Sequence, residues 1–270
     1  MKKILSLTLV LILLLSAVCI LPASATYKGY STKSGDFYYN ILSDGTASIV
    51  YYSGNATHLT FPTEIDGIKV SEIDHPFNTY VFPYEPNTTV RSITVPEGIL
   101  RCSIWAAPNL EELILPESLE DFCFAEGLRN SKIYKNPENW ENGVLYLGNR
   151  LLDVDEEIAP AKIKVKEGTK YISIWAFKNN DKLTEITFPD SLERIELEAF
   201  QYCKSLSKIN FNKNLKVIGD GAFYGCENLT EIKLPQSLNT LESMAFYDCK
   251  KLNKISLPDN LQHIGKNTDV

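Results

Sequence analysis

The last third of this chain repeats itself every 23 residues, and this period constrains the fold more than any other feature of the sequence. Four slots recur in consecutive copies, held by leucine, isoleucine, an Ala-Phe pair and cysteine. They are Leu183, Leu206, Leu229 and Leu252; Ile186, Ile209, Ile232 and Ile255; Ala176-Phe177, Ala199-Phe200, Ala222-Phe223 and Ala245-Phe246; and Cys203, Cys226 and Cys249. A fixed period of this length is typical of a solenoid, in which each copy is one structural unit stacked on the next.

One repeat can be interpreted residue by residue. Ile232 and Leu234 alternate with Lys233, which predicts a short strand with one apolar and one polar face. Pro235 ends this strand because proline has no N–H to donate to a neighbouring strand. The ring of Phe246 is large enough to fill the interior of its coil. Because a coil of this size cannot bury its apolar face alone, we expect the strands to stack into a parallel sheet over one continuous core.

The leucine spacing predicts an α/β leucine-rich-repeat solenoid. Its short parallel strands would lie on the concave face, with short helical or 3-10 turns on the convex side. Upstream the period shortens to 20 residues, because Ile93-Thr94-Val95-Pro96 aligns with Leu113-Ile114-Leu115-Pro116 and, less closely, with Ile133-Tyr134. This alignment predicts further strands at these positions.

Two β-hairpins are predicted beside the regular coils. Gly148-Asn149 separates two apolar runs within residues 136–155, which predicts a hairpin inserted into the stack. Asp44-Gly45 lies between the segments 37–42 and 47–52, and predicts an N-terminal hairpin that caps the first coil. The expected organisation is a β cap and first coil over residues 26–80, followed by the solenoid over residues 81–270.

Residues 1–25 have the pattern of a secretory signal peptide. Lys2 and Lys3 precede an uninterrupted apolar run from Ile4 to Leu21, and the small-residue site Ala23-Ser24-Ala25 follows at once. A retained membrane anchor is the alternative. The pattern favours export, with the mature protein secreted or associated with the cell surface and not inserted in the membrane.

The pattern Leu-x-x-Ile-x-Leu-Pro-x-x-Leu-x-x-Ile-x-x-x-Ala-Phe-x-x-Cys, read between Leu206 and Cys249, resembles the BspA-like leucine-rich repeats of bacterial surface proteins. The segment 61–73 and the inserted Gly143-Val144-Leu145-Tyr146 hairpin agree with this resemblance, which covers nearly all of residues 35–265. It implies a display scaffold used in adhesion, coaggregation or the binding of host or matrix proteins. Fold alone does not fix function, so the resemblance predicts the architecture more firmly than the ligand.

The charge of the chain argues against a nucleic-acid partner. The whole chain carries −7, and removal of Lys2 and Lys3 with the signal peptide takes the mature chain to −9. A domain of this sign repels phosphate backbones, and no basic stripe compensates for it.

Motifs for catalysis or cofactor binding are not found in the sequence. His58, His75 and His263 are scattered without metal-ligand spacing, and there is no nucleophile elbow, phosphate loop or zinc-protease motif. The acidic stretch 153–157 leaves calcium binding as an alternative to a solvated turn, although it lacks the spacing of a helix-loop-helix site. The sequence therefore predicts no enzyme, no metal and no cofactor.

The five cysteines after the signal peptide have two interpretations. Cys203, Cys226 and Cys249 share one slot in successive coils, which predicts a buried row that fills a small apolar space. Cys102 and Cys123 lie in neighbouring coils, and a disulfide between them is an open alternative in an oxidising compartment. The two are one place out of phase within their repeats.

The outward side chains of the stacked strands form the first candidate binding surface. They line up along the solenoid, with neighbouring strands about 4.8 Å apart. In one row glutamate and lysine alternate, and the alternative interpretation is a charge ladder that only keeps neighbouring strands from repelling one another. The functional interpretation is a mixed patch that binds a protein partner. Its members are Ile114, Tyr134, Lys164, Glu185, Lys208, Glu231, Lys233 and Lys254.

The irregular stretch 74–89 is a second candidate surface, because it is rich in proline and aromatic residues. Such a stiff loop loses little entropy on binding, which favours recognition. Alternatively, Phe77 and Phe82 only plug a coil that lacks the usual phenylalanine. Tyr80 and Tyr84 are then the candidate exposed pair.

Two functional hypotheses follow. The first is a secreted, non-catalytic module that binds a host, matrix or cell-surface protein. The second is an accessory or carbohydrate-associated module of a larger extracellular assembly. The repeats stop soon after Leu261 and Ile264, before another Ala-Phe pair. Because solenoids need polar caps to stay monomeric, self-association through the C-terminal end is also predicted.

Overall fold

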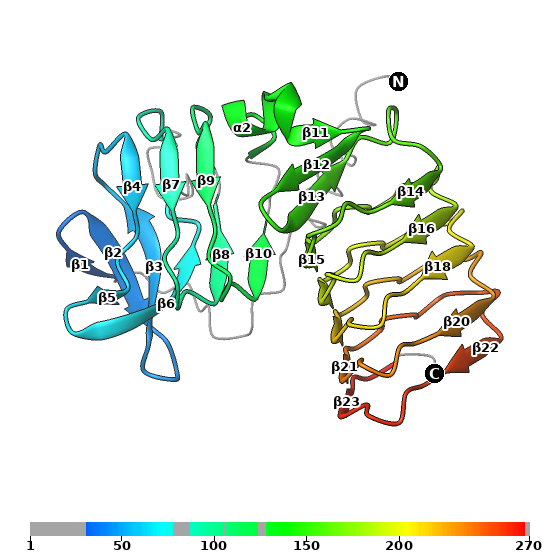
Figure 1. Cartoon of the computed structure of the whole chain (residues 1–270). Helices are drawn as coiled ribbons and strands as arrows, with labels where there is room; N and C mark the ends of the chain where they lie inside the picture. Colours follow the sequence, from blue (N-terminus) through cyan, green and yellow to red (C-terminus); the bar gives the residue numbers. More distant parts are fainter. Residues whose placement is uncertain (1–30, 78–86, 105, 124–127, 268–270) are drawn as a thin grey trace, which may run out of the picture.

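A computed structural model describes residues 31–77, 87–104, 106–123 and 128–267 of the chain. These residues form a β-solenoid of about nine turns with almost no helix. Figure 1 shows two stacks of strands, one from the N-terminal third and one from the C-terminal half, joined by a short helix and a hairpin. We call residues 31–123 the N-terminal block, residues 128–154 the link and residues 162–267 the C-terminal block.

The N-terminal block has two sheets on opposite sides of its coils. The smaller one is parallel and consists of β4 (His58–Thr60), β7 (Ser92–Thr94) and β9 (Glu112–Ile114). The larger one contains β1 (Thr32–Ser34), β2 (Phe37–Ile41), β3 (Ala47–Tyr52), β6 (Ile68–Asp74), β8 (Arg101–Ser103) and β10 (Asp121–Cys123), with β5 (Glu64–Ile65) paired to β6.

The predicted N-terminal hairpin is the antiparallel pair β2–β3, with Gly45 in the left-handed region at φ 84°. From β3 onward, along β6, β8 and β10, the pairing in this sheet is parallel. The hairpin therefore leads directly into the stack of coils.

The C-terminal block repeats one pattern five times, with a strand on each of two faces. The first strands are β14 (Lys162–Lys164), β16 (Glu185–Thr187), β18 (Lys208–Asn210), β20 (Glu231–Lys233) and β22 (Lys254–Ser256). The second strands are β15 (Tyr171–Ile172), β17 (Arg194–Ile195), β19 (Val217–Ile218), β21 (Thr240–Leu241) and β23 (His263–Ile264). The second strands form one continuous parallel ladder, whereas the first strands divide into β14-β16-β18 and β20-β22.

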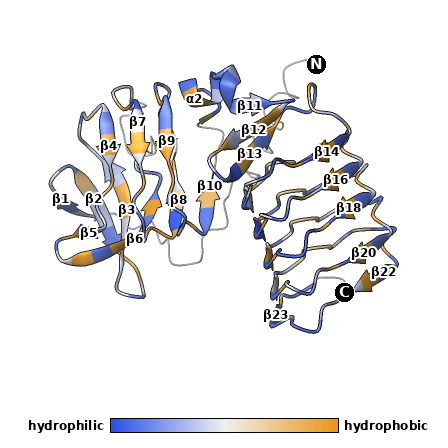
Figure 2. Cartoon of the chain, viewed as in Figure 1, coloured by the Kyte–Doolittle hydropathy of each residue, from blue (hydrophilic) through white to orange (hydrophobic). Residues whose placement is uncertain are grey.

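The interior of the C-terminal block is filled by the repeated residues. Phe177, Phe200, Phe223 and Phe246 stack one above the next, with ring centroids 4.5, 5.0 and 5.3 Å apart. Apolar residues recur at the same places along successive coils, drawn orange in Figure 2. The stacked rings remove apolar surface from water in every coil, which is the main stabilising contribution in such a fold.

The predicted cysteine row is confirmed. Cys203, Cys226 and Cys249 are buried, and each thiol donates a hydrogen bond to the carbonyl of a phenylalanine in the preceding coil, at 3.0 to 3.2 Å. Cys102 and Cys123 are both buried. In the β8–β10 ladder Cys102 lies opposite Phe122 and Cys123 opposite Ser103, so the phase difference seen in the sequence keeps these cysteines out of register.

The predicted α/β class is wrong, and so is the prediction of helical or 3-10 turns on the convex side. Within the described residues the only helices are α2 (Lys132–Lys135) and the 3-10 turn η2 (Pro137–Asn139), both in the link. At the first three Ala-Phe turns the backbone N–H of phenylalanine donates to the alanine carbonyl of the next coil, as from Phe200 to Ala222 at 2.7 Å. These bonds between coils replace the bonds within a helix, and residues at positive φ interrupt helical geometry at the same turns.

The link joins the two blocks through a hairpin whose two faces are both buried. The hairpin is formed by β12 (Val144–Leu147) and β13 (Arg150–Val154), and β11 (Trp140–Glu141) pairs with the other side of β12. Both pairings are antiparallel, which confirms the predicted insertion. Val144 and Leu151 pack into the core of the C-terminal block, whereas Leu145 and Leu152 pack into the core of the N-terminal block. Because neighbouring strand residues point to opposite faces, one short hairpin serves both cores.

A buried ion pair reinforces this junction. Arg150 on β13 is fully buried, and its Nη1 donates to Glu196 Oε1 at 2.6 Å. Its Nη2 donates to the carbonyl of Leu119 in the N-terminal block, and its guanidinium lies 4.0 Å from the ring centroid of Tyr171. A second pair between the blocks joins Arg194 to Asp121 at 3.4 Å.

Candidate functional site

The outer face of the first strands in the C-terminal block brings together six of the predicted residues. We call it the strand face. Glu185 forms ion pairs with Lys208 at 2.6 Å and with Lys162 at 3.4 Å, and Glu231 forms one with Lys254 at 2.5 Å. The hydrogen bond from Lys208 is the main reason that the pKa of Glu185 falls to about 2. The members are Lys164, Glu185, Lys208, Glu231, Lys233 and Lys254.

This geometry agrees with the charge-ladder interpretation. Each of these glutamates has a lysine partner on a neighbouring strand, so the charges of the row are largely satisfied within the protein. Exposed pairs of this kind contribute little to stability and are screened by salt. Lys164 and Lys233 are exposed at the second outward position of their strands.

Ile114 lies on the other block. It is 49% exposed on β9, which pairs with β7, whereas β14 pairs with β16. The link separates the two sheets, so Ile114 does not continue the row of Lys164 and Glu185. The single continuous row expected from the sequence is therefore two separate rows.

Tyr134 was expected on a strand, and this prediction is wrong. Residues 132–135 form α2, because the buried Ser131 caps the helix and its side chain accepts the N–H of Tyr134 at 3.2 Å. The Tyr134 hydroxyl donates to Asp153 at 2.9 Å, and its ring meets Trp140 edge-on at 5.1 Å. Burial raises the pKa of this hydroxyl. Tyr134 is thus a half-buried part of the link.

In the acidic stretch near β13, Asp153 and Asp155 bond to other groups of the same chain. Asp153 is 7% exposed, and it pairs with Arg129 at 3.3 Å besides accepting from Tyr134. Asp155 accepts the backbone N–H of Glu157 at 3.0 Å. Tyr80 and Tyr84, the other candidate pair, lie outside the described residues.

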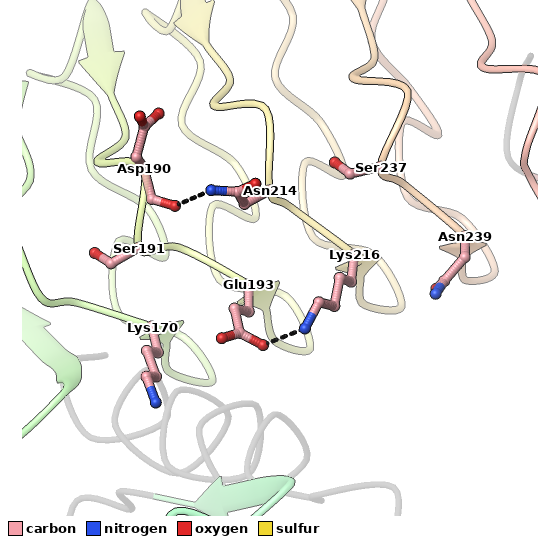
Figure 3. Close-up of a pocket in the computed structure, with 8 residues that line it drawn as sticks. All are labelled: Lys170, Asp190, Ser191, Glu193, Asn214, Lys216, Ser237 and Asn239. Atoms are coloured by element: carbon pink, nitrogen blue, oxygen red, sulfur yellow. Dashed lines mark hydrogen bonds and ion pairs between the residues drawn. The ribbon is translucent and has the colours of Figure 1, made fainter.

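A polar groove of about 520 Å³ runs along the turns between first and second strands (Figure 3). Its polar groups are engaged in bonds between coils: Asn214 donates to the carbonyl of Asp190 at 2.8 Å, and Lys216 pairs with Glu193 at 2.6 Å. Figure 3 shows both contacts. The lining is Lys170, Asp190, Ser191, Glu193, Asn214, Lys216, Ser237 and Asn239.

A row of aromatic side chains follows the Ala-Phe turns of the C-terminal block. We call it the turn ridge, formed by Trp175, Tyr202, Tyr224 and Tyr247 together with Met244. The rings of Tyr202 and Tyr224 are 5.2 Å apart and perpendicular, and those of Tyr224 and Tyr247 are 5.5 Å apart and stacked. Tyr247 is 41% exposed and Met244 is 39% exposed. The ridge presents ring edges and hydroxyls on an ordered backbone.

Several ridge residues hold an unusual backbone conformation. Trp175, Tyr202 and Met244 have φ of 61°, 59° and 54°, in the left-handed region that favours glycine. Gly221 occupies the slot of Trp175 and Met244 in another coil, and Gly225 occupies the slot of Tyr202. A Cβ on Gly225 would lie 2.5 Å from the Tyr202 ring, so this glycine leaves room for the ring.

The charges around the ridge are mostly acidic. Glu198 is paired, because Lys178 approaches it at 2.9 Å and the indole N–H of Trp175 donates to it at 2.8 Å. Burial raises the pKa of Asp220, and the negative charges of Glu198 and Glu242 raise it further. This crowding of like charges is electrostatically unfavourable without a cation nearby.

The sequence contained a signal for the ridge that our interpretation missed. Tyr224 and Tyr247 each follow the repeated phenylalanine of their coil and stand 23 residues apart. Tyr202 comes one slot later, and Trp175 stands before its Ala-Phe pair, so no single column of the repeat contains all four rings. Their proximity appears only after the turn is folded.

Asp74, His75 and Ser103 form a polar cluster at the ends of β6 and β8. The Nε2 atom of His75 lies 3.2 Å from the Ser103 hydroxyl, and its Nδ1 contacts the Asp74 carboxylate. Hydrolases use these residue types in this order. Ser103 is only 8% exposed on a paired strand, which keeps its hydroxyl away from a substrate, and the cluster serves to join β6 to β8.

The comparisons with known proteins agree with the solenoid architecture. Residues 158–268 match the model of the BspA type leucine rich repeat region, in six copies. This part of the chain belongs to the BspA-type leucine-rich repeats. No curated protein matches the sequence, and none of the helices in the described ranges is long and apolar enough to cross a bilayer.

Several solved structures to which this chain is similar come from bacteria. A leucine rich cell surface protein of Faecalibacterium prausnitzii A2-165 is 17% identical, with 88% of this chain and 91% of that chain covered and a TM-score of 0.45. The pneumococcal vaccine antigen PcpA is 15% identical, with coverage of 88% and 85% and a TM-score of 0.46. A leucine rich repeat protein of T. pallidum is 21% identical, with coverage of 87% and 86% and a TM-score of 0.34.

Proposed function

We propose that this protein is a secreted, non-catalytic binding module that recognises another protein through the surface of its solenoid. The observation that carries the proposal is the placement of outward side chains in rows along stacked coils, while the interior is filled by the repeat's own apolar residues. Such scaffolds typically offer extended surfaces to partners. The repeat family is consistent with a protein-interaction role.

The proposed organisation keeps residues 1–25 as a signal peptide, which lies outside the described residues. The cap and first coil would extend over residues 26–80 and the solenoid over residues 81–270. Secretion or attachment to the cell surface is tested by separating native cells into medium, wall and membrane fractions and probing each with an antibody. Recovery of the mature chain in the cytoplasm alone would contradict this proposal.

Binding is tested with the mature chain immobilised on beads and exposed to serum and to matrix extracts. We expect a small set of proteins to be retained after a salt wash and identified by mass spectrometry. Empty beads and the urea-denatured chain are the controls, because an unfolded apolar chain retains proteins without specificity. Equal retention by the folded and denatured chains, or none by either, would contradict the proposed function.

A role in a larger carbohydrate-containing assembly is the second candidate. The observation that favours it is the polar groove of Figure 3, whose amide and hydroxyl groups are suited to sugar hydroxyls. A glycan array probed with the same chain tests it. Binding of glycans that is lost when Asn239 and Ser237 are replaced with alanine would favour this role over the first.

Exposed apolar residues in the last described coil support the predicted self-association. Leu257 is 42% exposed and Ile264 is 47% exposed, in slots whose counterparts Leu234 and Leu241 are buried. An apolar end of this kind favours contact with a second copy. Sedimentation velocity over a range of concentrations is the measurement, and a single monomeric species throughout would contradict the prediction.

A further inference from the structure

At the turn ridge, one cation of the protein itself, Lys178, contacts both an aromatic ring and a carboxylate. The ammonium group of Lys178 lies 4.9 Å from the centroid of the Trp175 ring and 2.9 Å from a carboxylate oxygen of Glu198. The same carboxylate accepts the indole N–H of Trp175. A lysine is thus placed against an aromatic ring and beside a carboxylate, the arrangement in which cation–π attraction and charge pairing add.

Later coils carry rings in the lysine slot and not in the slot of Trp175, which holds Glu198, Gly221 and Met244 there. The slot of Lys178 is occupied by Tyr224 and Tyr247 two and three coils further on. The hydrogen bond with Tyr202 and burial raise the pKa of Tyr224 most, and the nearby negative charges of Asp248 and Glu198 raise it further. Among the described residues, Asp220 and Asp248 take part in no ion pair, and the nearby Lys250 is bonded to Glu227 at 2.8 Å.

We propose that the turn ridge binds an extended, arginine- or lysine-rich segment of a protein partner, whose cations lie against the hydroxyl ends of Tyr224 and Tyr247 and beside Asp220 and Asp248. This inference rests on the proposed function and names the surface and the chemistry of the partner. Each cation of the segment would combine a contact to an aromatic side chain with a contact to a carboxylate, as Lys178 does in its own coil. The crowded carboxylates around Asp220 would be relieved by such a ligand.

The backbone of the ridge supports this assignment. Keeping a non-glycine residue in the left-handed region costs about 1–2 kcal/mol, and the ridge does so at Trp175, Tyr202 and Met244. The same two slots have positive φ in every coil, at Asn179, Glu198 and Asp248 as well, so the turn imposes this conformation. Gly221 and Gly225 show that glycine fits both slots, so the strain comes from the choice of a larger side chain there.

The ring geometry favours a cationic segment over a sugar. Tyr224 and Tyr247 are stacked at an interplanar angle of 29°, and Tyr202 meets Tyr224 edge-on. Much of each ring face is therefore directed at the next ring in the row. Sugars stack on open ring faces, whereas a guanidinium or ammonium can also be held by the surrounding carboxylates and hydroxyls.

The test uses the full mature chain and a fluorescein-labelled peptide of six Arg-Gly repeats, with binding followed by fluorescence anisotropy. A peptide of six Glu-Gly repeats is the negative probe. We expect the arginine peptide to bind and the glutamate peptide not to bind. Asp220→Asn with Asp248→Asn should weaken binding about five- to tenfold, because two exposed charge contacts are lost. Tyr224→Leu with Tyr247→Leu, which retains apolar packing, should weaken it by a similar factor.

The matched control is Glu185→Gln with Glu231→Gln, which removes the same charge from the strand face. It should change binding less than twofold. Equal weakening by the two carboxylate pairs would mean that the peptide only senses the net negative charge, and would overturn the proposal. No binding of the arginine peptide would overturn it too, while proteins retained in the pull-down would leave the broader binding function standing. Circular dichroism spectra and melting curves confirm that each variant is folded.

Discussion

The strand face and the turn ridge belong to the same coils, yet their side chains are used differently. On the strand face Glu185 and Glu231 have lysine partners from neighbouring strands, and the backbone is ordinary extended chain. On the ridge, Asp220 and Asp248 have no ion-pair partner among the described residues, and Met244 is held at φ 54°. The strand face is largely satisfied by its own contacts, whereas the ridge carries charges and strain that a partner can compensate.

The largest expected effect concerns the interior beneath both surfaces. Phe223 is fully buried between the rings of Phe200 and Phe246. Phe223→Ala should lower the free energy of unfolding by about 3–5 kcal/mol through lost burial and the remaining cavity. Lys233→Ala on the strand face should lower it by less than about 0.5 kcal/mol. Equal losses in urea titrations would contradict the register of the coils.

A second prediction concerns a carboxylate inside the stack, in contrast to those on its surfaces. Burial is the largest effect on Glu196 and raises its pKa to about 7. The positive charges of Arg150 and Arg194 oppose this rise, whereas the negative charge of Asp121 adds to it. Since the folded pKa exceeds the ordinary value of 4.5, the stability from the protonated carboxyl is fully present below pH 4.5 and is lost as the pH rises through 7.

Glu196→Gln should remove this pH dependence. Between pH 4.5 and 7.5 the free energy of unfolding of the parent should fall relative to the variant by up to about 3 kcal/mol. Glu242→Gln is the matched control, because Glu242 stands in the same slot two coils further on and is only half-buried. Urea titrations across this pH range measure both, and parallel curves for the parent and Glu196→Gln would contradict the assignment.

The smallest expected effect has the opposite sign and separates stability from binding. Met244→Gly should raise the free energy of unfolding by about 0.5–1 kcal/mol, because glycine removes the left-handed strain at the cost of some chain entropy. The same change should weaken binding of the arginine peptide by removing an exposed apolar contact. A clear loss of stability in thermal or urea unfolding would mean that Met244 is needed by the fold.

The repeat itself made most of the C-terminal block predictable. Slots such as Leu229 and Phe223 recur at one spacing, and a solenoid is the fold that buries them all. The turns were not predictable in the same way, because their hydrogen bonds go to the next coil, and local sequence carries no sign of that. Tyr134 was misplaced because the cap at Ser131 decides between helix and strand, whereas our interpretation used only the weak 20-residue alignment.

The candidate surfaces were only partly predictable for a similar reason. The strand face follows from alternation along each strand, so Glu185 and Lys208 could be assigned to one row. The ridge depends on turn geometry, in which Trp175 and Tyr202 stand in different slots and both have positive φ. Pairing of charges across strands is likewise a property of the folded sheet, and it made the strand face a weaker binding candidate than its composition predicted.

The most direct test compares the two surfaces in one pull-down from serum and matrix extracts. One variant combines Tyr224→Leu, Tyr247→Leu and Asp248→Asn on the ridge, and the other combines Glu185→Gln, Glu231→Gln and Lys233→Ala on the strand face. We predict that the ridge variant loses the proteins retained by the parent, because aromatic residues dominate such interfaces, and that the strand-face variant keeps them. Retention by the ridge variant together with loss by the strand-face variant would show that the charge ladder is the recognition surface, and would contradict this account.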